Sequence, residues 1–152
     1  MSEPQPSQHD AGPPAAYRFL YGPFAVSGLL LSSTQFYTRQ VTDGYPERRT
    51  LWSGLLDPNW ADVAMFSLLL AFGLVALAVC GAVRAVRTIA LPVAVAALAL
   101  LGALMLMAKI GYSDPAPPFD DGGAMLVTLA WAGVLLGLVH TAHLVVWHRR
   151  RP

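Results

Sequence analysis

Two long apolar stretches in the middle of the chain constrain its fold more than any other feature. Residues 63–83 and 88–108 each run for 21 positions without an Asp, Glu, Lys or Arg. As an α-helix, each would be about 31 Å long, close to the thickness of a bilayer's hydrocarbon core. Only residues 84–87 join them, and four residues are too few to cross a bilayer. The sequence therefore predicts a transmembrane helical hairpin.

Two further uncharged segments extend this prediction to four transmembrane helices. Residues 19–38 and 122–147 are also free of Asp, Glu, Lys and Arg, and each is long enough to span. The composition agrees, because 55% of the residues are hydrophobic and only 12% are charged, outside the range of soluble globular domains. We predict an all-α integral membrane protein, with a transmembrane domain over 17–148 and helices at 19–38, 63–83, 88–108 and 122–147.

The distribution of basic residues predicts how this domain is oriented. Residues 1–16 form a proline-rich tail without an apolar run, and residues 149–152 form a basic end. With both termini inside, the inner face carries six arginines (Arg18, Arg84, Arg87, Arg149, Arg150 and Arg151) and the outer face four basic residues (Arg39, Arg48, Arg49 and Lys109). The positive-inside rule thus favours cytoplasmic termini in a multi-pass protein of the bacterial inner (plasma) membrane.

The longest connection, residues 39–62, is predicted to contain a short helix in the outer membrane interface. Pro46 stands at a plausible first turn, and Leu51, Trp52 and Leu55 would then lie on one side of residues 46–56. Arg48 would lie on another side. This amphipathic pattern is typical of a helix that lies flat on a membrane.

Two histidines near the inner end of the fourth predicted helix are the sharpest chemical candidates. His140 and His143 are ionisable residues at membrane depth, and imidazole can ligate haem iron, zinc or copper. A haem held between two helices needs a histidine on each, and the other two histidines are His148, on the same helix, and His9, in the tail. The chain could therefore build such a site only with a partner's ligands. The alternative, which we favour, is a pair of neutral, hydrogen-bonded histidines.

Small and polar residues at helical spacing predict two faces for close helix packing. The first is a stripe on residues 19–38, formed by Gly28, Ser32 and Gln35. The second lies on the fourth helix and is formed by Gly133, Gly137 and Thr141. Such stripes let membrane helices approach closely, either within one chain or against another subunit, and the sequence leaves both possibilities open.

Several functional classes lack their chemical requirements in this sequence. No carboxylate lies within the apolar spans to carry a coupling ion, which counts against a small multidrug transporter. One cysteine cannot support the chemistry of the disulfide-generating quinone reductases, and neither a nucleotide-binding glycine loop nor a catalytic metal motif is present. We therefore predict neither an enzyme nor a bound cofactor or metal, and no nucleic-acid partner.

In size and layout the chain resembles the small accessory membrane subunits of high-GC, actinobacterial respiratory complexes, such as the cytochrome bcc and cytochrome oxidase supercomplex. The resemblance covers the whole chain as topology and composition, without a diagnostic motif. It implies a non-catalytic accessory or assembly subunit whose partners are other integral membrane subunits and membrane lipids. Two alternatives remain: a small transporter or lipid- or quinone-binding protein, and a haem-binding redox protein that uses His140 and His143 with partner ligands.

Overall fold

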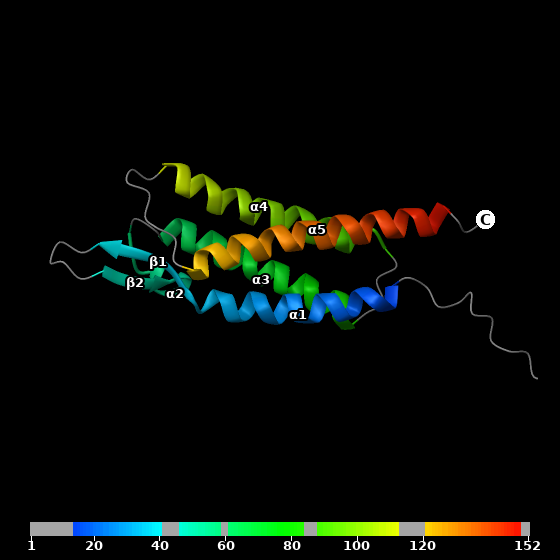
Figure 1. Cartoon of the computed structure of the whole chain (residues 1–152), viewed down its shortest axis with the longest axis horizontal. Coiled ribbons are helices and arrows are strands. Elements are labelled where there is room, and N and C mark those ends of the chain that lie inside the picture. The colour runs from blue at the N-terminus through cyan, green and yellow to red at the C-terminus, as the bar shows by residue number, and fades with distance from the viewer. Residues whose placement is uncertain (1–13, 41–45, 59–60, 84–87, 113–120, 150–152) are drawn as a thin grey trace, which may run out of the picture.

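The computed structural model describes residues 14–40, 46–58, 61–83, 88–112 and 121–149 as a bundle of long helices with a small β-hairpin at one end (Figure 1). The long helices are α1 (Pro14–Ser32), α3 (Ala61–Val83), α4 (Ala90–Tyr112) and α5 (Asp121–Arg149). The hairpin consists of β1 (Gln35–Gln40) and β2 (Pro46–Thr50), and the one-turn helix α2 (Leu51–Gly54) follows it.

Three of these helices are long and apolar enough to cross a membrane, as in a multi-pass membrane protein. The qualifying segments are Ala64–Val83, Ala90–Ala108 and Gly122–Arg149. They match three of the predicted helices to within a few residues at each end. In the span of α3 only 17% of the residues are buried within the chain. Large apolar side chains of α3 such as Phe66 and Leu69 are exposed, as expected where lipid or another apolar partner is the neighbour.

The first predicted helix is wrong over its last six residues, 33–38. It was expected to run from residue 19 to residue 38, but α1 ends at Ser32 and Gln35 begins strand β1. The Ser32 and Thr34 hydroxyls donate to the carbonyls of Leu29 and Leu31, at 2.7 Å and 2.8 Å. Serine and threonine that bond the preceding turn in this way weaken helix propagation. The backbone beyond Thr34 instead pairs with β2.

The predicted amphipathic helix over 46–56 is also wrong in its first part. Pro46–Thr50 is a strand that pairs antiparallel with β1, with Thr38 opposite Arg48 and an irregularity between Gln35 and Tyr37. The helix begins only at Leu51, where the Thr50 side chain accepts from the Ser53 amide and Ser53 Oγ accepts from the Thr50 amide. This reciprocal capping starts a new helix and so ends the strand.

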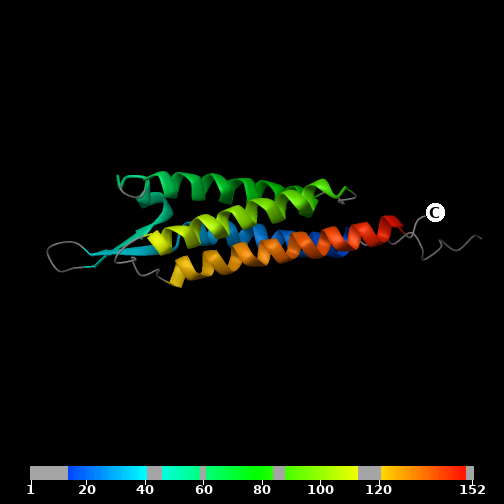
Figure 2. The ribbon, with the colours of Figure 1, turned by 90° about the horizontal axis from the view of Figure 1, so that it is seen from above.

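The long helices pack as two pairs that face each other. α1 packs mainly with α3 and α4 mainly with α5, while weaker α3–α4 and α1–α5 contacts close the bundle. Two clusters of buried side chains fill it. Tyr17, Tyr21, Ala25, Ala78 and Val95 form the cluster toward the chain termini, and Leu51, Leu68 and Leu106 form the cluster toward the hairpin. The N-terminal end of α1 and the C-terminal end of α5 lie at the same end of the bundle, opposite the hairpin (Figures 1 and 2).

Candidate functional site

Two tyrosines of α1 pair with the two histidines of α5 at the terminal end of the bundle. The Tyr21 hydroxyl is 2.9 Å from His140 Nδ1, and the Tyr17 hydroxyl is 3.1 Å from His143 Nδ1. Residues four apart on α1 and three apart on α5 each share one helix face, so the two pairs form side by side. The pairs join segments that are 119 and 126 residues apart in the sequence. They tie α1 to α5, whose remaining contact is limited.

The rings of this Tyr–His cluster are closely packed. The Tyr17 ring stacks on the His140 imidazole with centroids 3.9 Å apart and planes 9° from parallel. Tyr21 is completely buried, and His140 is 1% exposed. Gly81 of α3 makes room for Tyr21, because a Cβ at that glycine would lie 2.7 Å from a ring carbon. The cluster therefore depends on three helices.

His140 has one polar atom that this cluster does not use. Its Nε2 is buried and has no hydrogen-bond partner among the residues that the structure describes. In this packed arrangement an exogenous haem or quinone cannot reach Nε2 from outside the bundle without displacing neighbouring side chains. The geometry thus favours a hydrogen-bonded histidine over a metal ligand. Within the same described residues, no group of three or more His, Cys, Asp and Glu side chains could hold a metal ion.

Arg18 joins the same end of the bundle to α3. Its Nε and Nη2 donate to the carbonyls of Ala82 and Val83, at 3.0 Å and 2.7 Å. These carbonyls belong to the last turn of α3, where the helix leaves acceptors unsatisfied and carries partial negative charge. Arg18 is therefore a C-terminal cap for α3, supplied by α1.

The structure places Gly133 and Gly137 at contacts within the chain. A Cβ at Gly137 would lie 2.5 Å from the Pro92 carbonyl oxygen and 2.8 Å from the Ala96 Cβ, so α5 rests directly on the α4 backbone there. A Cβ at Gly133 would approach Phe24 of α1 to 2.8 Å. Thr141 donates its hydroxyl to the Gly137 carbonyl at 2.7 Å.

The other predicted stripe is divided between two elements. Gly28 faces α3 and α5, where a Cβ would meet Val75 at an ordinary contact distance of 3.4 Å. Ser32 is buried at the end of α1. Gln35 lies in β1, and its Oε1 accepts from Arg48 Nη1 of β2 at 3.2 Å. The three residues therefore do not form one continuous helix face.

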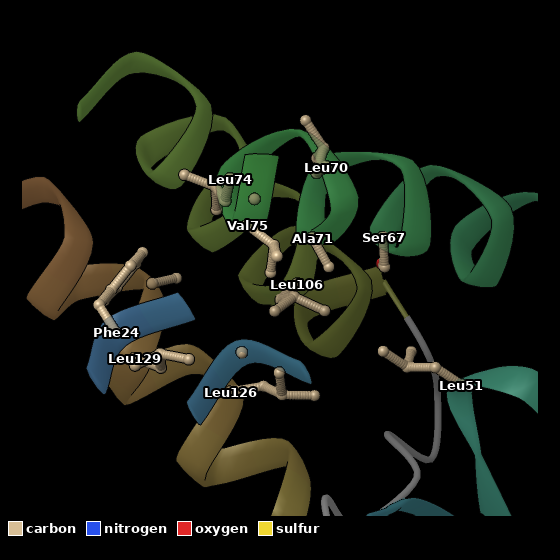
Figure 3. A pocket seen from close by; sticks show the side chains of 13 residues that line it. Phe24, Leu51, Ser67, Leu70, Ala71, Leu74, Val75, Leu106, Leu126 and Leu129 are labelled. Atoms are coloured by element: carbon tan, nitrogen blue, oxygen red, sulfur yellow. The ribbon is translucent and has the colours of Figure 1, made fainter. Parts of the chain in front are cut away.

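A pocket of about 60 Å³ lies between the two helix pairs (Figure 3). All four long helices contribute to its wall, and Leu51 of α2 adds to it from the hairpin side. Ala71, Val75 and Leu106 from α3 and α4 lie close together in the view, opposite Leu126 and Leu129 of α5.

Tyr17, Tyr21 and Arg18 were not singled out as functional from the sequence. A sequence pattern could have indicated the tyrosines. Tyr17 and Tyr21 are four residues apart and His140 and His143 are three apart, so each pair lies on one face of its helix and the two pairs could meet. Comparison with protein-family models, with curated proteins and with solved structures finds no match to this chain.

Proposed function

We propose that the chain is a non-catalytic accessory or assembly subunit of a larger membrane protein complex, a bacterial respiratory supercomplex in particular. In this proposal α1 is a fourth transmembrane helix. Its 19 residues give a length of about 28 Å, and the uncharged part, residues 19–32, covers about 21 Å of the ~30 Å hydrocarbon core, so Arg18 would extend toward the inner interface. Four crossings put both termini on one side, and the arginine distribution favours the cytoplasmic side of the inner membrane.

The β-hairpin is the observation that carries this proposal. It extends past the ends of the neighbouring helices (Figures 1 and 2). Within the described part of the chain its sheet has two strands, so each strand has one edge without a described neighbour in the sheet. The hairpin is anchored at its base, where a Cβ at Gly122 of α5 would clash with the Gln35 carbonyl oxygen.

A two-stranded hairpin is at best marginally stable alone in water, and its open edges can pair with a strand of another protein. A neighbouring subunit would supply the missing contacts. The exposed strand edges favour a docking arm on a membrane-anchored bundle over a catalytic unit. It agrees with the Tyr–His cluster, in which the tyrosine hydroxyls and the histidine Nδ1 atoms are already paired with each other.

The other candidates make different predictions. A haem protein would show a Soret band that changes when His140 and His143 are replaced, and the buried Nε2 of His140 does not favour it. A small transporter would show substrate-dependent flux after reconstitution into vesicles. An accessory subunit would show neither property, and its deletion would lower the amount of an assembled complex.

The proposal is tested by purification after mild solubilisation of wild type and a hairpin variant. In the variant, Gly-Ser-Gly replaces residues 38–48, which removes most of the paired strands. The wild type is expected to co-purify with integral membrane subunits at fixed stoichiometry, and the variant is expected to lose them while the helices keep their thermal unfolding. Arg48→Ala is the control, because it removes one side-chain hydrogen bond and leaves the strands in place. A wild-type chain that purifies alone, with no complex affected by its deletion, would contradict the proposal.

A further inference from the structure

The pocket between the helix pairs lies at the level between the two buried clusters. Phe24, Leu74 and Val75 line it and also pack against the cluster toward the termini. Leu51 and Leu106 line it and belong to the cluster toward the hairpin. The space is thus an unfilled section of the bundle interior, partly open to the outside.

Small side chains explain why this section is unfilled. Gly28, Ala71, Gly102 and Ala130 contribute to the wall from four different helices. Gly102 has room for a Cβ, which would lie at an ordinary contact distance of 3.9 Å from the nearest atom, Leu70 Cδ1. An empty apolar space costs the dispersion contacts that its wall would otherwise make. Something that fills the pocket would therefore stabilise the bundle.

The chemistry of the wall selects an aliphatic occupant. Among the lining residues that the structure describes, Ser67 is the one with a polar side chain, and the side chains of the others are hydrocarbon or absent. The head of a quinone carries two carbonyls that need donors, and a single hydroxyl cannot serve both. The volume equals about four to six water-sized spheres, which suits a short stretch of methylenes.

From the pocket's depth within the apolar helices, its aliphatic wall and its size, we infer that it binds one acyl chain of a membrane phospholipid. The acyl chain would lie between the α1/α3 pair and the α4/α5 pair, against Gly28 and Gly102. This site goes beyond the proposed accessory role, because it does not involve the hairpin. Either inference can fail without the other.

The full-length protein in phosphatidylcholine nanodiscs provides the test, with a phosphatidylcholine that carries a diazirine on one acyl chain as the probe. We expect photo-crosslinks to concentrate on the pocket wall, for example on Ser67 and Leu106, above the level on outward-facing Leu69 and Leu101. Gly102→Leu fills the pocket and should reduce the wall crosslinks at least fivefold. Ala97→Leu adds the same side chain on an exposed position of α4 and should leave them unchanged.

Thermal unfolding in detergent gives an independent readout that also checks folding. Added phosphatidylcholine should raise the Tm of wild type and of Ala97→Leu, whereas Gly102→Leu should have a raised Tm that no longer responds. Equal labelling of wall and outward-facing residues, or wall crosslinks that Gly102→Leu does not reduce, would overturn the inference. So would competition by an isoprenoid quinone that excess unlabelled phosphatidylcholine does not match.

Discussion

Tyr21→Phe tests whether the hydrogen bond between α1 and α5 stabilises the bundle. The change removes only the hydroxyl that lies 2.9 Å from His140 Nδ1 and leaves the ring against Gly81. Both partners are buried, so His140 would keep two buried ring nitrogens without partners in the described structure. Leaving a buried polar group unsatisfied costs about 1–3 kcal/mol in soluble proteins, whereas hydrogen bonds between membrane helices contribute about 0.6 kcal/mol on average and about 1.7 at most.

Because this pair is almost fully shielded, we expect a loss near the upper membrane value, about 1.5 kcal/mol. The assay is equilibrium unfolding in mixed micelles with increasing sodium dodecyl sulfate, followed by tryptophan fluorescence. Tyr17→Phe is the matched control, since its partner His143 is exposed and can form hydrogen bonds with other groups or water; its cost should stay below about 0.6 kcal/mol. A double-mutant cycle with His140→Leu should give a coupling of about 1 kcal/mol. Equal losses for both tyrosines, or a coupling of zero, would refute the reasoning.

Further substitutions test the helix packing and the Arg18 cap of α3. Gly137→Ala should destabilise the bundle by about 1–3 kcal/mol in the same unfolding assay, because the added methyl meets the α4 backbone, whereas Gly102→Ala has room and should be neutral or stabilising. Gly81→Ala should displace the Tyr21 ring and be as costly as Gly137→Ala; a neutral effect would mean that this ring does not rest on α3. Arg18→Ala removes the cap from the last turn of α3 and should cost about 0.3–1 kcal/mol, with Arg18→Lys recovering part of the loss.

The sequence predicted the apolar helices well and the hairpin poorly, for a physical reason. A run such as 63–83 is long and apolar enough to specify a spanning helix without reference to other parts of the chain. Residues 35–40 contain aromatic and β-branched side chains at a spacing that fits a helix stripe as well as a strand. Their structure is decided by pairing with Pro46–Thr50, and local periodicity does not report that pairing.

The candidate site was likewise predicted only in part, because some of its features depend on which helices pack together. The sequence identified His140 and His143 as unusual polar groups at membrane depth, because that follows from residue type and position alone. It did not identify Tyr17 and Tyr21 as their partners, since the pairing depends on which helices become neighbours. The sequence did not predict the pocket either, because the pocket forms where small residues of four helices lie at the same level of the bundle. The roles of Gly133 and Gly137 against another subunit stay a prediction.

The most direct test of the accessory role is the size of the particle that holds this chain in the native membrane. Polymer extraction without detergent, followed by mass photometry and subunit identification, would measure it. We expect the chain in particles far larger than its own 16.3 kDa, with a fixed set of other integral membrane subunits, and we expect the hairpin variant to be absent from them. A chain found only in particles that contain itself and lipid would contradict the account.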